Sequence, residues 1–212
     1  MCPRIVDKEE KKNRIVLAAM KVFSEKGVKS SRMADIASQA EIGKGTIYEY
    51  FRNRDEILVE SFYLMLGEME GNLELALKDI ENPEDRIALI FRAVFESMSQ
   101  YPDDFMMLFV EFWSEGMRHR GEDDKRFLNL DAFYREFRQE LADILDEGIQ
   151  AGQFVAMDTT AVASVMIAIL DGLLLQVILD RKAFDHKNVI EESLKMILNG
   201  IKVKDASAGG DS

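Results

Sequence analysis

The residues with the most evident chemistry lie close together near the amino terminus. The segment GKGTIYEYFRNRDE, residues 43 to 56, holds two glycines, a threonine, two tyrosines and several basic side chains. Threonine can contact a base edge or a thymine methyl group, and lysine can bind guanine or phosphate. Tyrosine hydroxyls and backbone N–H groups are common phosphate ligands. This combination of residue types indicates a nucleic acid as the partner of the segment.

The charge of the chain is divided unevenly, which bears on that partner. The formal net charge is −12, but residues 1–55 carry 12 Lys and Arg against 8 Asp and Glu, a balance of +4. The remaining residues hold 15 against 31, a balance of −16. A basic end can face a polyanion while an acidic body points away from it. The alternative is that these are solvated surface charges without a common partner.

Other residues give little support for catalysis, for a cofactor or for a metal. The single cysteine, Cys2, allows no internal disulfide and no thiolate cluster. The two histidines, His119 and His186, lie in polar segments and share no metal-ligand or catalytic spacing with a carboxylate pair. The letters GKGT lack the spacing of a phosphate-binding loop. We therefore predict a protein that is not an enzyme and that has no cofactor and no metal site.

The elements that position these residues are predicted to be helices. Apolar residues at i, i+3, i+4, i+7 and i+8 from Ile15 to Phe23 indicate a helix that ends at Gly27. Ser30 or Ser31 is predicted to cap a short second helix. Further starts are predicted at Asn53, at Asn82 with Pro83, and at Asp158, and a helix end at Gly152. The pattern predicts an all-α fold of about nine helices without a sheet.

The first three predicted helices have the layout of a helix-turn-helix DNA-binding unit. Small and branched apolar residues, including Ile36, Ala37 and Ile47, would lock the second and third helices together. Lys44, Gly45, Thr46, Tyr48, Glu49 and Tyr50 remain for the outer face and ends of the third helix.

The segment SSRMADIASQAEIGKGTIYEYFRNRDEIL, residues 30 to 58, resembles the DNA-binding signature of the TetR family of transcriptional regulators. The resemblance is close over residues 10–60, and beyond them it rests on helix count, length and the letters DGL in the eighth helix. It implies a DNA-binding domain at 1–54 and a helical ligand-binding and dimerisation domain at 55–203. The low-complexity composition of residues 204–212 separately predicts a disordered tail. The DNA-binding residues that it implies are Lys44 and Thr46 at bases, Tyr48, Tyr50 and Arg54 at phosphates, Arg32 at the backbone, and Gly45 among them.

Two residues depart from the family pattern. Glu41 stands in the turn where the family commonly has glycine, so a left-handed backbone there would cost roughly 1 kcal/mol. Gly43 stands where serine or threonine commonly caps the third helix, a change that costs only a few tenths of a kcal/mol. The turn is still predicted to form, and the anionic Glu41 bears on DNA affinity.

The last two predicted helices are apolar over more than one face. The runs AVASVMIAIL and LLLQVIL contain more apolar surface than the acidic remainder of a single chain could cover. Ser164, Asp171, Gly172 and Gln176 interrupt the longest run, Ala161 to Leu179, so a buried helix is favoured over a membrane span. The resemblance implies a homodimer through these two helices, and burial within one domain is the alternative. The charged amino-terminal segment predicts no export signal and a cytoplasmic protein.

The middle of the chain is rich in methionine and aromatic residues, which line adaptable apolar cavities well. The resemblance implies an inducer pocket among helices four to eight, and plain core is the alternative reading of each residue. Glu111, Glu115 and Asp171 lie close to apolar residues in the sequence, so one of them could meet a cationic group of the ligand; the favoured alternative for each is a hydrogen-bonded or exposed acid. The predicted pocket residues are Phe62, Met65, Phe91, Phe95, Met98, Phe105, Phe109, Phe112, Trp113, Phe133, Phe137, Met166 and Asp171.

The predicted function is that of a ligand-responsive DNA-binding regulator. We expect a repressor that leaves its double-stranded DNA operator when a small apolar or amphipathic molecule binds a conformation unsuited to DNA. The alternative is a helical small-molecule-binding or scaffold protein without specific DNA binding, for which Glu41 is the best argument.

Overall fold

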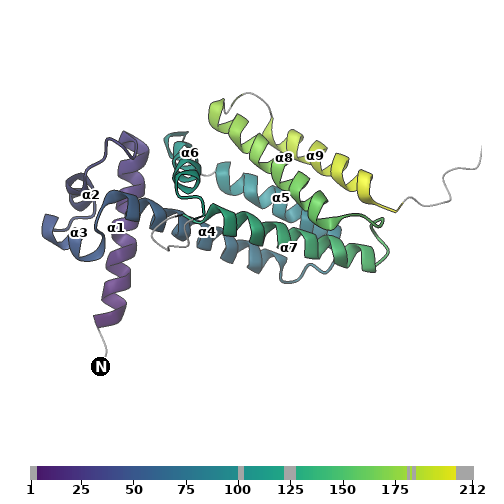
Figure 1. Ribbon diagram of the computed structural model, residues 1–212, viewed down its shortest axis with the longest axis horizontal. Helices are drawn as coiled ribbons and strands as arrows, with labels where there is room; N and C mark the ends of the chain where they lie inside the picture. Colours follow the sequence, from purple (N-terminus) through teal and green to yellow (C-terminus); the bar gives the residue numbers. More distant parts are fainter. Residues whose placement is uncertain (1–3, 100–102, 122–127, 181, 183–184, 204–212) are drawn as a thin grey trace, which may run out of the picture. The chain divides into compact units, whose positions relative to one another are not determined.

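The computed structural model describes residues 4–99, 103–121, 128–180, 182 and 185–203. Within these ranges the chain forms nine α-helices and no strand, which confirms the all-α prediction (Figure 1). The helices are α1 (Arg4–Lys26), α2 (Met33–Gln39), α3 (Lys44–Tyr50), α4 (Arg54–Leu77), α5 (Pro83–Ser99), α6 (Asp103–Arg118), α7 (Leu130–Gln150), α8 (Thr159–Leu179) and α9 (His186–Ile201). The predicted tail, 204–212, lies outside the described residues.

Most helix boundaries follow from the predicted capping residues. α1 is followed by Gly27 at φ 75°, a left-handed conformation that glycine adopts without strain. The side chain of Asn53 accepts from the Glu56 amide at 2.8 Å at the start of α4. Asp158 accepts from the Ala161 amide at 2.9 Å at the start of α8. These side chains satisfy amide groups that have no partner within the helix.

The predicted serine cap of α2 is wrong. Arg32 occupies the N-cap position of α2, and its amide donates to the Asp35 carboxylate at 3.1 Å. The buried hydroxyl of Ser31 donates instead to the Gly27 carbonyl at 2.7 Å. Ser31 therefore closes the loop between α1 and α2, a role that depends on packing against the preceding helix.

The chain forms two compact units, each with its own core. The first comprises residues 1–72 and 100–132, where α1 packs against α2 and α6, and α2 packs against α3. Its fully buried large side chains include Ile15, Phe23, Ile36, Ile47, Ile57, Leu58, Leu108 and Phe112. The division predicted between residues 54 and 55 is one of function, which packing alone does not test.

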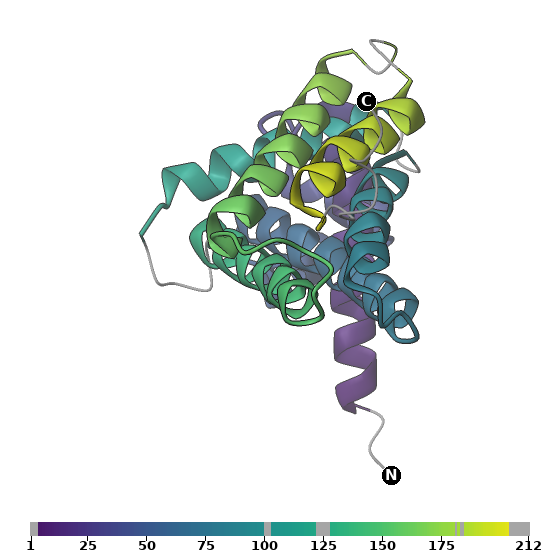
Figure 2. The same ribbon diagram turned by 90° about the vertical axis from the view of Figure 1, so that its right-hand side faces the viewer.

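The second unit comprises residues 73–99 and 133–212, where α5 packs against α8 and α9. Helices α8 and α9 lie side by side in both views (Figure 1 and Figure 2). Ion pairs at its surface join Arg92 to Glu191 at 2.6 Å and Lys202 to Glu84 at 2.6 Å. The segment after α7 is tied to the end of α9, since the Val155 amide donates to the Ile201 carbonyl at 2.8 Å.

α8 is long and apolar enough to span a bilayer by length and composition. Among the described residues it alone meets that criterion, and 33% of its apolar stretch is buried within the structure. An apolar helix that packs in a protein core meets the same criterion. Its fully buried side chains form one face, which contains Ala163, Met166 and Leu170.

Candidate DNA-binding surface and ligand-binding residues

α3 has an inner side and an outer side, as its sequence spacing predicts. Ile47 is fully buried and Phe51, directly after the helix, is 3% exposed. Lys44, Gly45 and Tyr48 are exposed on the other side, and 51% of Tyr48 is accessible. Thr46 and Tyr50 are half-buried. The helix is thus fixed to the core by apolar residues while lysine, threonine and tyrosine remain available for DNA.

The turn between α2 and α3 is fixed in a strained conformation. Glu41 has φ 55°, a left-handed conformation that costs a non-glycine residue roughly 1 kcal/mol. The Ile42 amide donates to the Ala37 carbonyl at 3.0 Å, and the Arg14 guanidinium donates to the Ala40 carbonyl at 2.9 Å. These bonds hold the turn although its residue is not glycine. The Glu41 side chain is exposed.

Gly43 and Gly45 contribute backbone without side chains at the start of α3. Gly43 is the N-cap, as predicted, in an extended conformation that requires no glycine. A Cβ added to Gly45 would meet no atom of this chain within 4 Å. Packing within the protein therefore does not explain the glycine, whereas a close approach of a partner to this backbone would.

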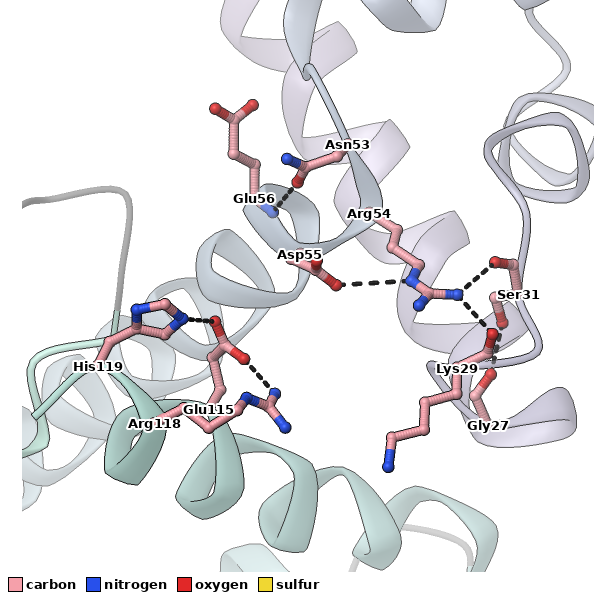
Figure 3. Close-up of polar contacts among 10 residues, drawn as sticks. All are labelled: Gly27, Lys29, Ser31, Asn53, Arg54, Asp55, Glu56, Glu115, Arg118 and His119. Atoms are coloured by element: carbon pink, nitrogen blue, oxygen red, sulfur yellow. Dashed lines mark hydrogen bonds and ion pairs between the residues drawn. The ribbon is translucent and has the colours of Figure 1, made fainter.

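Arg54 is engaged within the protein (Figure 3). Its Nη1 donates to the carbonyl oxygens of Lys29 and, at 3.3 Å, of Ser31, both in the loop between α1 and α2. Its Nε lies 3.5 Å from Asp55. The guanidinium thereby joins the start of α4 to that loop, and a phosphate contact by Arg54 stays a prediction.

Arg32, predicted at the DNA backbone, is exposed at the start of α2. Beside it, the Asp35 carboxylate accepts from the Arg32 amide and lies 3.3 Å from Lys26. The amide hydrogen bond and Lys26 lower the pKa of Asp35. Asp35 therefore stays ionised at neutral pH and helps to fix the backbone from which the Arg32 side chain extends.

A buried charged cluster at the end of α6 was not predicted, although Glu115 was among the three acids considered for a cationic ligand group. Glu115 is only 4% exposed, and its carboxylate pairs with Arg118 and lies 3.3 Å from Nε2 of His119 (Figure 3). The hydrogen bond to Glu115 raises the pKa of the Arg118 guanidinium, and Asp55 adds to this effect. The i, i+3 and i+4 spacing of the three residues was the available signal.

The predicted pocket residues fall into two groups, one in each compact unit. In the first unit, Phe62, Met65, Phe109 and Phe112 are buried and Trp113 is half-buried. The ring centroids of Phe62 and Phe112 are 4.9 Å apart at an interplanar angle of 67°, an edge-to-face packing. The Phe105 side chain lies outside the described residues.

A larger share of the second group is accessible. Phe91, Phe95 and Met166 are buried, whereas Phe133, Phe137 and Asp171 are half-buried. Burial raises the pKa of Asp171, and a hydrogen bond from Tyr134 partly offsets this effect. The Met98 side chain lies outside the described residues. Asp171 thus lies against Tyr134, whose ring centroid is 5.4 Å from that of Phe133.

Apolar side chains are exposed on α8 and α9, in the second unit. Leu179 and Met196 are each 77% exposed, and Val165 and Leu175 are accessible as well. These residues are uncovered in a single chain, which is typical of a surface that pairs with another copy.

Among the described residues, no group of three or more His, Cys, Asp or Glu side chains could hold a metal ion.

Two family models match the chain. One, described as bacterial regulatory proteins of the tetR family, matches residues 15–60 and includes α2 and α3. The other, described as the C-terminal part of BetI-type transcriptional repressors, matches residues 83–198. Together they include the candidate DNA-binding helix and most of the second compact unit.

Curated proteins and solved structures resemble the chain over most of its length. The fatty acid metabolism regulator protein of Bacillus subtilis (strain 168) is 25% identical over 201 residues, 93% of this chain and 98% of that protein. The transcriptional regulator FadR from Bacillus subtilis, solved in complex with stearoyl-CoA, has a TM-score of 0.72 at 22% identity, over 89% of this chain and 98% of that one. A regulator from Saccharomonospora viridis, solved in complex with choline, has a TM-score of 0.76 at 22% identity, over 92% of this chain and 100% of that one. At these identities, the structural matches establish the fold.

Proposed function

Because the chain belongs to the TetR family of bacterial regulatory proteins, we propose that it represses transcription from an operator that α3 reads, and that a small amphipathic molecule releases it. The observation that carries the proposal is the division of α3 into a buried anchor, Ile47, and an exposed side with Lys44 and Tyr48. A helix presented in this way fits the major groove.

We assign the outer residues of α3 to different parts of the DNA. Thr46 and Lys44 face base edges, where a hydroxyl and an ammonium group can discriminate between base pairs. Tyr48 and Tyr50 contact phosphates through their hydroxyls, and Gly45 allows the DNA backbone to come close. Arg32 supplies a weaker backbone contact. Arg54 positions α4 through its bonds to the Lys29 and Ser31 carbonyls, and its predicted phosphate contact would be made from that position.

A single copy of α3 makes few base contacts, so the operator-binding form is a homodimer. We propose that the exposed apolar residues of α8 and α9 form its interface. Two-fold symmetry would then place two recognition helices on half-sites about 34 to 36 Å apart, or a multiple of that distance. Such a protein works in the cytoplasm, where its DNA lies.

The inducer is amphipathic, with an apolar part and a polar end. The half-buried rings of Phe133 and Phe137 provide apolar contact, and Tyr134, next to Phe133, hydrogen-bonds to the polar Asp171. Similar regulators were solved with stearoyl-CoA and with choline, and each of these ligands combines apolar groups with a charge. Binding releases DNA if the ligand prefers a conformation that does not fit the operator.

A pair of substitutions tests the assignment of α3. Thr46→Ala should relax the preference at one base position, because it removes one base contact. Tyr48→Phe should weaken binding evenly across operator variants, because it removes a phosphate contact. Affinities for the DNA upstream of the gene, measured by electrophoretic shift with single-base variants, distinguish the two effects. If neither substitution changes affinity or preference, the assignment is wrong, and a helical ligand-binding protein without specific DNA binding becomes the better account.

A further inference from the structure

The first turns of α7 leave the apolar face of that helix only partly covered. Leu141, Leu145 and Gly148 are buried on this face. One and two turns earlier, on the same face, Phe137 and Tyr134 are half-buried. The face therefore continues beyond the core as a short aromatic surface that another molecule can cover.

The rings of this surface contact one another. The centroids of Phe133 and Tyr134 are 5.4 Å apart at an interplanar angle of 73°, and those of Phe133 and Phe137 are 6.2 Å apart at 30°. The faces of aromatic rings carry negative electrostatic potential, so they attract a cation that has given up part of its hydration. The surface is thus suited to an organic cation.

Asp171 of α8 adds a carboxylate at the same place. Its side chain is half-buried, and burial raises its pKa while the hydrogen bond from Tyr134 lowers it. Among the described residues, no lysine, arginine or histidine is a cause of that shift. The carboxylate is thus partly desolvated and is stabilised by the Tyr134 hydrogen bond, so an approaching cation would add a further favourable interaction.

We propose that Asp171 and the rings of Phe133, Tyr134 and Phe137 bind the cationic end of the inducer, an ammonium group with apolar substituents. This assignment rests on the proposed function. It specifies that the polar end of the inducer is positively charged. An alkylated ammonium suits the site better than a metal ion, because one carboxylate and aromatic rings do not supply the oxygen ligands that hard cations require.

Arg138, one turn after Tyr134 on α7, offers the competing chemistry. Its Nε is buried and has no hydrogen-bond partner among the described residues. An anionic ligand would give that nitrogen an acceptor but would also meet the carboxylate of Asp171. We favour the cation because it balances the charge of Asp171, and the anionic ligand is one outcome of the test.

Calorimetric titration of the full chain with three probes tests this choice. The probes are choline, its neutral isostere 3,3-dimethylbutan-1-ol, and decanoate as an anionic amphiphile. We expect choline to bind about tenfold or more tightly than the alcohol, since a desolvated cation gains from both the carboxylate and the rings. Asp171→Asn should remove that preference without changing the affinity for the alcohol. Asp146→Asn, at an exposed acid of α7, is the matched control and should change neither affinity.

Three results would overturn the proposal: equal binding of choline and the alcohol, a preference for choline that survives Asp171→Asn, or no saturation by choline below about 10 mM. Tighter binding of decanoate that is lost in Arg138→Gln would assign the site to an anion. The same preparations are assayed for DNA binding in a separate experiment. A protein that binds choline but no DNA would refute the proposed operator binding and leave this site intact.

Discussion

The outer face of α3 and the first turns of α7 both expose aromatic rings, but their surroundings differ in charge. Around Tyr48 and Tyr50 the sequence supplies Lys44 and a basic first quarter of the chain. Next to Phe133, Tyr134 hydrogen-bonds to Asp171, in the acidic remainder of the chain. The first surface therefore suits a polyanion and the second a cation. The net charge of −12 hides this difference, because it averages two regions with opposite partners.

The largest expected effect distinguishes a buried residue that supports a surface from a residue that is part of the surface itself. Ile47→Ala removes a fully buried side chain beneath α3 and should lower the free energy of unfolding by about 2 to 4 kcal/mol. Phe137→Ala removes a half-buried ring and should cost clearly less, because the wild-type ring already contacts solvent. Denaturant unfolding of both variants measures the difference. Equal losses would mean that Phe137 belongs to the core.

Replacing either of the two unusual acids should stabilise the protein, but the effects on binding should be opposite. Glu41→Gly should stabilise the protein by about 1 kcal/mol, since glycine adopts φ 55° without strain. It should also tighten DNA binding, because it removes a negative charge near the phosphates. Asp171→Asn should stabilise the protein at neutral pH and weaken binding of choline. Thermal unfolding measures the stability of each variant, and the DNA and choline assays measure the two binding effects. A Glu41→Gly protein that is less stable than wild type would contradict the account of the turn.

The raised pKa of Asp171 predicts a dependence on pH. A cation binds the ionised carboxylate. Choline affinity should therefore be highest above the pKa of Asp171 in the folded protein and should fall as the pH drops through that pKa. In the absence of ligand the folded state holds this proton more tightly than the unfolded state. The Asp171 contribution to stability should therefore decline as pH rises from the ordinary value of 3.8 to the folded pKa. The choline affinities of wild type and Asp171→Asn, measured by titration over a range of pH, should converge at low pH. Parallel pH profiles would show that Asp171 does not bind the cation.

A smaller effect is expected from an ion pair remote from both surfaces. Arg92 and Glu191 join α5 to α9 through two bonds of 2.6 and 2.8 Å, and the bond to Arg92 lowers the pKa of Glu191. Both side chains are nearly half exposed, so Glu191→Gln should cost less than about 1 kcal/mol. That loss should shrink at acidic pH, where wild-type Glu191 is protonated as well. A loss comparable to that of Ile47→Ala would contradict this estimate.

The sequence predicted the first surface more fully than the second, for a physical reason. The inner and outer positions of α3 follow from local spacing on a short helix, so Ile47 and Lys44 were assigned to the correct sides. The bonds of Arg54 to Lys29 and Ser31, and the buried hydroxyl of Ser31, join segments far apart in the chain. Spacing carries no information on such contacts. Asp171 was one of three acids named for their apolar neighbours, but its partner Tyr134 lies on another helix and Arg138 was missed.

The central claim is that α3 binds operator DNA, and the salt dependence of that binding tests it most directly. Affinity for the DNA upstream of the gene should fall steeply as salt rises, because phosphate contacts release counterions. Tyr48→Phe should weaken binding across the whole salt range, while Asp171→Asn without ligand should leave the curve unchanged. If Lys44 meets a phosphate in addition to a base, Lys44→Ala should reduce the slope of log affinity against log salt by about 1. Absent binding at low salt, or binding that does not respond to salt or to Lys44→Ala and Tyr48→Phe, would contradict the account.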